Sequence, residues 1–369
     1  MINVDKLLKL LKEKKISFFT GVPDSVLKKL SSKIDKFPSS KHKIAVNEGS
    51  AVGMGIGHYL STKKMPCVYM QNSGLGNAIN PLISIAHQKV YSIPLLLLIG
   101  WRGSPSQKDE PQHKVKGKIT PSLLKLLNIK YCIVKNQKDF KKLNNLIIKG
   151  KKEKKVIACL VEKNVLNANV KSKNYNSNKN KYANRKSFIQ YLLKNINKKT
   201  KIISTTGHTS RELMQIRDEM KLNKGQDFYM VGGMGHALSV AIGMSLRSKK
   251  QIICLDGDGS LLMHLGSMFT AGFNDKIRLK HILLNNNSHE SVGGQVTNAN
   301  KINFKNLSKS LGYKYFYKIK KDSEIKPILS SFLRKKDCSF LEVKINTNLD
   351  LKLPRPKNLI KIKNTFLNQ

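Results

Sequence analysis

Polar residues in the second half of the chain have the types and spacing of a cation site. Asp258, flanked by Gly257, Gly259 and Ser260, follows the apolar run 251–255, and Asn286 follows the apolar run 281–284. Ligands of open α/β sheets collect at the carboxyl ends of such strands. Carboxylate and amide oxygens suit Mg²⁺, and the two glycines would let the backbone approach a phosphate. The pattern predicts a metal–diphosphate site, the alternative being a turn that only reverses the chain.

A second carboxylate of interest lies far away in sequence. Glu48 follows a short apolar run and begins a stretch of small residues with helical character, 48–58. It could transfer a proton to a bound ligand. It could also be an ordinary acid in the first turn of a helix, where the helix dipole favours negative charge.

The elements that would position these residues alternate between apolar strands and helical patterns. With 369 residues the chain is long enough for two domains. The rhythm predicts an α/β fold with two mostly parallel sheets, each flanked by helices. A polar linker is predicted at 171–184, between domains 1–170 and 185–369. The predicted strands are 16–20, 68–71, 95–99, 156–161, 202–206, 252–255, 281–284 and 340–345.

The Gly-Asp-Gly turn followed at this distance by Asn-Asn resembles the cofactor motif of thiamine-diphosphate (ThDP) enzymes. Three further blocks narrow the resemblance to the phosphonopyruvate decarboxylase family of 2-oxo acid decarboxylases. It covers nearly the whole chain, from Asp5 to about residue 356. The blocks are Gln-Asn-Ser-Gly-Leu-Gly-Asn at 71–77, Gly-Trp-Arg-Gly at 100–103 and Ser-Val-Gly-Gly-Gln at 291–295.

The resemblance implies a pyrimidine-binding first domain and a diphosphate-binding second domain, with ThDP and Mg²⁺ as cofactors. Asp258, Asn286 and the backbone carbonyl of Ser288 would hold Mg²⁺ against the diphosphate. Gly232 would accept a hydrogen bond from the pyrimidine amino group, and Met234 would support the bent cofactor. Met234 could instead be ordinary core packing, because methionine fills irregular gaps.

The resemblance also implies catalytic roles. Glu48 would hydrogen-bond the pyrimidine ring nitrogen and so promote proton removal from the thiazolium carbon. Asp24 and His113 are the candidates for the later proton transfers. Asp24 could instead cap a helix after Pro23, and His113 could be a plain loop histidine.

The implied reaction converts 3-phosphonopyruvate to phosphonoacetaldehyde and CO₂, a step of phosphonate biosynthesis. Arg102 is the candidate for gripping the phosphonate bidentately, with Lys108 and His289 as weaker ones, unless Arg102 is a surface residue. Asn72 and Gln112 could donate to the substrate carboxylate or ketone. The nearest alternative is sulfopyruvate decarboxylase, which differs in taking a sulfonate.

Two positions depart from the family pattern. Asn287 stands where a glycine is expected after the double asparagine, although asparagine tolerates left-handed backbone angles. His208 also replaces another residue type, and the sequence assigns it no role.

The formal net charge of +45 raises a nucleic-acid-binding alternative. The lysines, however, are spread over the whole chain, and no zinc-finger, homeodomain or aromatic RNA-binding motif is found. We therefore expect no nucleic-acid partner. The basic field could help to steer an anionic 2-oxo acid.

The sequence also allows predictions of the cellular compartment and of the oligomeric state. The five cysteines are isolated in sequence, which favours buried thiols in a reducing compartment. No signal peptide or membrane span is recognised, so we expect a cytoplasmic protein without a membrane partner. The resemblance implies a homodimer or higher homo-oligomer with interfacial active sites.

Overall fold

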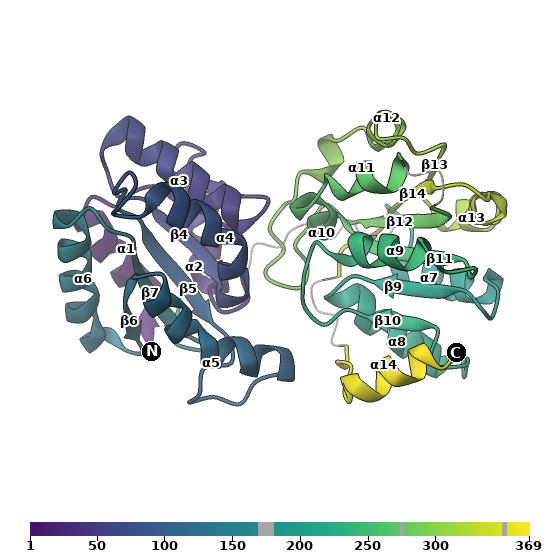
Figure 1. Cartoon of the computed structure of the whole chain (residues 1–369), viewed down its shortest axis with the longest axis horizontal. Coiled ribbons are helices and arrows are strands. Elements are labelled where there is room, and N and C mark those ends of the chain that lie inside the picture. Colours follow the sequence, from purple (N-terminus) through teal and green to yellow (C-terminus); the bar gives the residue numbers. More distant parts are fainter. Residues whose placement is uncertain (169–180, 274–276, 349–352) are drawn as a thin grey trace. The chain divides into compact units, whose positions relative to one another are not determined.

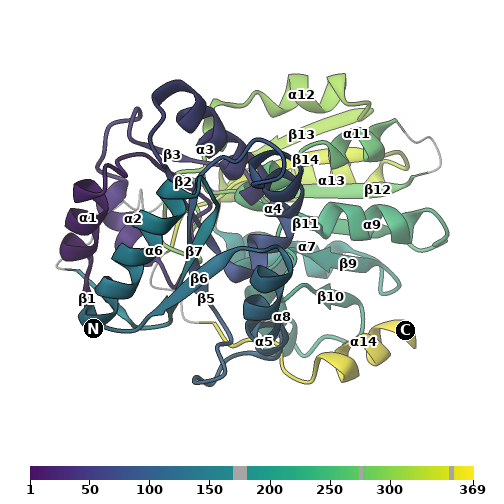
Figure 2. The ribbon, with the colours of Figure 1, turned by 60° about the vertical axis from the view of Figure 1, so that its left-hand side comes forward.

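The computed structural model describes residues 1–168, 181–273, 277–348 and 353–369, and the chain divides into two compact units, Met1–Lys173 and Asn174–Gln369 (Figures 1 and 2). Most of the predicted linker, 171–180, lies outside the described residues. Its last residues belong to the second unit: Ala183 forms a parallel bridge with Ile345, and Asn184 caps helix α7 (Arg185–Asn195).

The first unit contains a six-stranded sheet in the order β3-β2-β4-β5-β7-β6, in which all neighbouring strands are parallel. A small parallel pair, β1 with β8, lies outside this sheet. The strands are β1 (Ile2–Asn3), β2 (Phe19–Gly21), β3 (His42–Ile44), β4 (Cys67–Gln71), β5 (Leu96–Trp101), β6 (Lys130–Val134), β7 (Ile157–Glu162) and β8 (Leu166–Asn167).

The second unit repeats this architecture with a parallel sheet in the order β10-β9-β11-β12-β14-β13. When the six strands of each sheet are numbered along the chain, both sheets have the order 2-1-3-4-6-5. The strands are β9 (Lys201–Ser204), β10 (Asp227–Tyr229), β11 (Ile252–Gly257), β12 (Leu279–Asn285), β13 (Tyr315–Ile319) and β14 (Ser339–Lys344).

Helices cover both faces of each sheet. In the first unit, α1 (Val4–Glu13), α2 (Lys28–Ile34) and α6 (Phe140–Lys152) share one core cluster, while α3 (Glu48–Thr62), α4 (Leu75–Pro81) and α5 (Pro111–Leu126) share the other. In the second, α7, α8 (His208–Glu219) and α13 (Ile325–Arg334) pack on one face. The opposite face carries α9 (Ala237–Ser245), α10 (Asp258–Met263), α11 (Ser267–Gly272), α12 (Phe304–Ser310) and α14 (Leu359–Leu367).

Burial on both faces explains the apolar strands. Along β11, Ile253 and Leu255 join one core cluster, whereas Ile252 and Cys254 join the other. Successive side chains of a strand point to opposite faces, so a doubly covered strand must be apolar throughout. The α/β prediction is confirmed, and all eight predicted strands exist with shifts at their ends.

Six strands are absent from the predicted list: β1 and β8, which form the separate pair, and the edge strands of the two six-stranded sheets, β3, β6, β10 and β13. Strands β6 and β13 have mostly half-buried or exposed residues, so they lack a continuous apolar run. The segment between strands β11 and β12 forms two short helices, α10 and α11.

Two further findings concern the chain as a whole. The five cysteines are all unpaired thiols, four of them buried, in agreement with the sequence prediction. Within the described residues, every helix is too short or too polar to cross a lipid bilayer.

Candidate active site

In the second unit, the predicted metal ligands follow adjacent strands. Gly257 at the end of β11 pairs with Leu284 of β12, so Asp258 and Asn286 emerge at the same carboxyl edge of the sheet. Asp258 is 3% exposed and accepts a hydrogen bond from the Thr297 hydroxyl. Burial raises the pKa of Asp258 to about 7, although the bond from Thr297 acts in the opposite direction. A cation beside this carboxylate would supply the missing counter-charge.

The loop that follows β12 is already folded into a compact turn. The Asn286 Oδ1 accepts from Ser288 N at 3.0 Å, and Asn287 has φ = 57°, the left-handed conformation that the sequence predicted for it. Among the described residues, the buried Ser288 hydroxyl has no hydrogen-bond partner. Carboxylate, amide and backbone oxygens gathered in this way could hold Mg²⁺.

Glycine 259 brings three segments of the second unit together. A Cβ at this position would lie 3.4 Å from the Met234 methyl group and 2.8 Å from the His289 ring. The predicted cofactor residues Met234 and Gly259 are therefore neighbours. Burial lowers the pKa of His289 to about 4, so this imidazole is neutral at pH 7 and makes a poor anchor for a phosphonate.

Hydroxyl groups tie the glycine-rich segment 232–235 to the turn after β11. Ser260 Oγ accepts from Gly235 N at 3.1 Å and from Thr205 Oγ1 at 2.8 Å. The predicted cofactor residues Gly232 and Ser260 therefore belong to segments that meet at this edge of the sheet. They could accommodate a diphosphate and the ring system attached to it.

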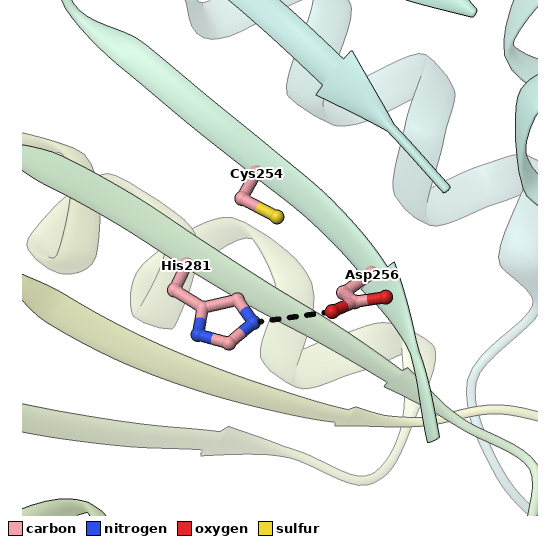
Figure 3. Close-up of side chains that lie close together, drawn as sticks. All are labelled: Cys254, Asp256 and His281. Carbon is pink, nitrogen blue, oxygen red and sulfur yellow. Dashed lines mark ion pairs between the residues drawn. The ribbon is translucent and has the colours of Figure 1, made fainter. Parts of the chain in front are cut away.

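A buried group of potential metal ligands lies just beneath this turn (Figure 3). Cys254, Asp256 and His281 each offer one ligand atom within 4.8 Å of the others, and His281 Nε2 faces Asp256 Oδ2 at 3.7 Å. The His281 Nδ1 lies 3.0 Å from the hydroxyl of Tyr313. If Tyr313 donates to Nδ1, the ring carries its proton on Nε2, toward the carboxylate. The separation of 3.7 Å is longer than a hydrogen bond, so the histidine and the aspartate only face each other, and the Asp256 carboxylate accepts from Gly257 N at 2.8 Å.

In the first unit, Glu48 is buried at the start of α3 and is held by residues that follow β4. Asn77 Nδ2 donates to Glu48 Oε2 at 2.8 Å. A Cβ on Gly74 would lie only 2.0 Å from Glu48 Oε1. The 71–77 block therefore forms the cradle of the carboxylate, a relationship that the sequence did not reveal.

Asp24 lies in the same unit and is 1% exposed. Its Oδ2 accepts from the backbone N–H groups of Val26 and Leu27, and its Oδ1 accepts from Gln71 Nε2 at 2.7 Å. Burial raises the pKa of Asp24 despite these bonds and the nearby Arg102. The carboxylate thus stabilises the turn that precedes α2, but it does not cap this helix, whose N-cap is Leu27 without a side-chain bond. The pKa of Asp24 is shifted toward the neutral acid.

Arg102 is 7% exposed, so the surface alternative for this residue is wrong. Its guanidinium forms a bidentate ion pair with Asp109, and its Nη1 lies 3.3 Å from Ser25 Oγ. The sequence offered no signal for this carboxylate partner. Arg102 is thus a buried cation beside the Asp24 turn, and Asp109 offsets much of its charge.

Asn72 was predicted to contact substrate, but the structure uses its side chain elsewhere. Its amide nitrogen donates to the Arg102 carbonyl and to Thr120 Oγ1, and its oxygen accepts from Arg102 N. These bonds join the ends of β4 and β5. Asn72 therefore positions Arg102, and we do not retain it as a substrate contact.

Gln112 and His113 lie in the first turn of α5, next to Arg102 in the fold. A Cβ on Gly103 would lie 1.9 Å from the His113 carbonyl oxygen, so this turn packs directly on the backbone after Arg102. Trp101 Nε1 fixes the same helix by donating to the Gly117 carbonyl. The predicted residues Asp24, Arg102, Gln112 and His113 are thereby brought to one region, whereas Lys108 is exposed.

Both units match models of known protein domains. Residues 3–122 match "Thiamine pyrophosphate enzyme, N-terminal TPP binding domain", and residues 205–343 match "Thiamine pyrophosphate enzyme, C-terminal TPP binding domain". Thiamine pyrophosphate is another name for ThDP. The fold and the two sets of clustered polar residues thus define a ThDP-binding enzyme.

Relatives among characterised proteins specify the family. The chain is 31% identical to a phosphonopyruvate decarboxylase of Streptomyces viridochromogenes, over 81% of this chain and 77% of the relative. It is 28% identical to a phosphonopyruvate decarboxylase of Streptomyces hygroscopicus, over 97% and 91%. A sulfopyruvate decarboxylase of Methanosarcina acetivorans is 27% identical over 93% and 92%. The chain belongs to the phosphonopyruvate decarboxylase family of ThDP-dependent enzymes.

Proposed function

We propose that the protein catalyses the ThDP- and Mg²⁺-dependent decarboxylation of 3-phosphonopyruvate to phosphonoacetaldehyde and CO₂, a step of phosphonate biosynthesis. The observation that carries this proposal is the buried Arg102, which lies at the carboxyl edge of the sheet that also presents Glu48. The two phosphonopyruvate decarboxylases among the relatives support the choice of substrate.

The metal ligands proposed for Mg²⁺ are the Asp258 carboxylate, the Asn286 amide and the Ser288 backbone carbonyl. The Asp258 carboxyl group is buried and lacks a cationic hydrogen-bond partner within the described part of the chain, where its side chain bonds to Thr297. A divalent cation would remove the cost of burying its charge. Gly232, Gly257, Gly259, Ser260 and Met234 complete the proposed cofactor residues in this unit.

When bound, ThDP would supply a nucleophilic carbon for the 2-oxo group and a sink for the electron pair released with CO₂. The residues of this chain have other tasks. Glu48, fixed by Asn77, would hold and return a proton at a ring nitrogen of the cofactor. Asp24, whose pKa is raised by burial, could deliver a proton to the substrate carbon, with His113 as the second candidate.

The substrate anion would be held by Arg102 and oriented by Gln112. The Asp109 ion pair fixes the guanidinium plane, so that its remaining N–H groups point in defined directions. A phosphonate carries more negative charge than a sulfonate. The positive charge that Arg102 retains beside Asp109 therefore influences whether the site favours the phosphonate or the sulfonate.

The alternative function is sulfopyruvate decarboxylation, favoured by the archaeal relative that covers 93% of this chain. A substrate panel tests both proposals: phosphonopyruvate, sulfopyruvate and pyruvate, each with ThDP and Mg²⁺, with CO₂ and aldehyde release measured. We expect the highest kcat/KM for phosphonopyruvate. Preference for sulfopyruvate would select the alternative, and inactivity on all three would refute a decarboxylase function.

We also propose that the active protein is at least a homodimer whose sites combine residues of two copies. Glu48 and Asp258 belong to different compact units, and the family resemblance supports pairing of the pyrimidine-binding domain of one copy with the diphosphate-binding domain of another. Sedimentation should show a dimer or a larger assembly.

A further inference from the structure

The loop that carries two of the proposed Mg²⁺ ligands is held from outside by a buried ion-pair cluster. This loop, residues 286–298 (the metal loop), closes on itself as a short antiparallel turn. His289 N donates to Gln295 O at 2.8 Å, Thr297 N donates to Asn287 O at 3.2 Å, and Ser288 bridges Val296. The metal loop is therefore a single structural piece.

Glu290 connects this piece to the rest of the second unit. Its Oε2 accepts from Arg185 Nη1 at 2.6 Å and lies 3.3 Å from His208 Nδ1, and its Oε1 accepts from Asn348 N. Its side chain is 5% exposed. Each oxygen of the carboxylate therefore has a partner outside the loop: the buried Arg185 for Oε2 and the backbone N–H of Asn348 for Oε1.

Two of the three partners of Glu290, Arg185 and His208, come from the first turns of two helices. Arg185 begins α7 and also pairs with Glu212 of α8, while His208 begins α8. The backbone approaches closely at the same point, because a Cβ on Gly207 would lie 3.4 Å from Ser291 Oγ. Both helices pack in the same core cluster, so they form a rigid support.

We propose that Glu290 is a positioning residue that, together with Arg185 and His208, holds the metal loop in the geometry needed to bind Mg²⁺. The inference rests on the proposed function, because it requires Asn286 and Ser288 to be metal ligands. It assigns His208, which the sequence left without a role, to this support. Neither Glu290 nor His208 is required to touch the metal or the substrate.

The physical reason is preorganisation. Residues that orient metal ligands from behind contribute typically 10- to 100-fold to metal affinity. Without Glu290 the loop keeps its internal bonds but loses its attachment to α7 and α8. Asn286 and Ser288 would then have to be fixed by the metal itself, and the ordering cost would appear as weaker Mg²⁺ binding.

Glu290→Ala is the main test variant, and the readout is the Mg²⁺ concentration that half-saturates ThDP binding, measured by calorimetry on the full-length protein. We expect this concentration to rise by about 10-fold or more. Glu290→Gln should recover part of the loss, because its amide oxygen can accept from Arg185 or Asn348. His208→Asn, which removes one contact of the carboxylate, should give a smaller rise.

A second buried ion pair of the same unit provides a matched control. Arg217 and Asp227 form a bidentate pair that joins α8 to the start of β10, with side chains 4% and 1% exposed. Asp227→Ala should lower the unfolding temperature comparably to Glu290→Ala but leave the Mg²⁺ requirement within about 2-fold of wild type, because it does not touch the metal loop.

The outcomes separate the two proposals. If the wild-type protein shows no Mg²⁺-dependent ThDP binding, the proposed function fails. If it does, and Glu290→Ala and Asp227→Ala raise the Mg²⁺ requirement equally, Glu290 is only structural and the inference is overturned. If Glu290→Ala does not fold, an unchanged Mg²⁺ requirement in both Glu290→Gln and His208→Asn would overturn it equally.

Discussion

Asn77 donates its side-chain amide to Glu48 across 2.8 Å, from the first turn of α4 to the first turn of α3. The contact is possible because Gly74 has no side chain. A Cβ at this position would overlap Oε1, the other oxygen of the Glu48 carboxylate. In the sequence, the block 71–77 served only to identify the family. In the fold it has a structural role. It fixes the carboxylate to which we assign proton exchange with the cofactor.

The first prediction concerns this cradle. Gly74→Ala places a methyl group 2.0 Å from Glu48 Oε1, so the carboxylate must move, and kcat should fall by about 100-fold, the scale of losing a positioned acid–base group. Gly76→Ala is the matched control, because a Cβ there meets nothing within 4 Å. Steady-state kinetics on both variants check this. Equal rates would show that Glu48 tolerates displacement.

The second prediction concerns Arg102. Arg102→Ala leaves the buried Asp109 carboxylate unpaired, so the variant should lose about 3–5 kcal/mol of stability. It should also lose far more activity on phosphonopyruvate than on pyruvate. The double variant Arg102→Ala/Asp109→Ala removes both charges and should regain much of the stability while the substrate preference stays lost.

Denaturant unfolding and the ratio of the two kcat/KM values separate these effects. Recovery of the preference in the double variant would indicate that the loss in Arg102→Ala came from misfolding. An unchanged ratio in both variants would place the phosphonate anchor elsewhere.

The sequence predicted the interior of the fold well because doubly covered strands must be apolar at every position. Strands such as β5 and β11 stand out for this reason, whereas the edge strands β6 and β13 have exposed residues and lack such a run. The Asp258 turn and the left-handed Asn287 could be predicted because local chain geometry dictates the residue type.

Partnerships between distant residues could not be predicted. Nothing in the pattern shows that Asp109 pairs with Arg102, that Thr297 bonds to Asp258, or that Asn72 is used within the sheet edge. These contacts depend on loop paths, which a single sequence does not specify. The role of His208 depends in the same way on Glu290, 82 residues further along the chain (290 − 208).

The third prediction concerns pH. Burial raises the pKa of Asp258 to about 7 in the absence of metal, and only the ionised carboxylate binds Mg²⁺. Mg²⁺ binding should therefore strengthen as pH rises toward 7 and level off above it. The stability of the metal-free protein should depend on pH in the opposite direction. Between about pH 4 and 7 the native state retains a proton on Asp258 that the unfolded chain has lost, so stability falls as pH rises.

Calorimetric Mg²⁺ titrations at fixed ThDP from pH 6 to 8.5 would measure this dependence. Phosphate groups titrate near pH 6 as well. Asp258→Asn provides the control, since it removes the carboxyl group and should flatten the part of the profile near pH 7. An identical profile in Asp258→Asn would mean that Asp258 does not bind the metal.

The fourth prediction tests the shared site. Glu48→Gln should retain the fold and bind ThDP but lose roughly 100-fold or more in rate. Asp258→Ala should lose Mg²⁺ and ThDP together. When the two inactive chains are co-expressed with different tags, a mixed dimer should contain one site with both lesions and one with neither.

Random pairing makes half of the dimers mixed, with one intact site of two, so activity should return to about one quarter of wild type. Purification through both tags should raise the value to about one half for the same reason. The control is a chain that carries both substitutions. Paired with either single variant, it leaves a lesion in every site and should restore nothing. If the mixture of single variants also stays inactive although mixed dimers are recovered, each site draws Glu48 and Asp258 from one chain, and the proposal of shared sites is wrong.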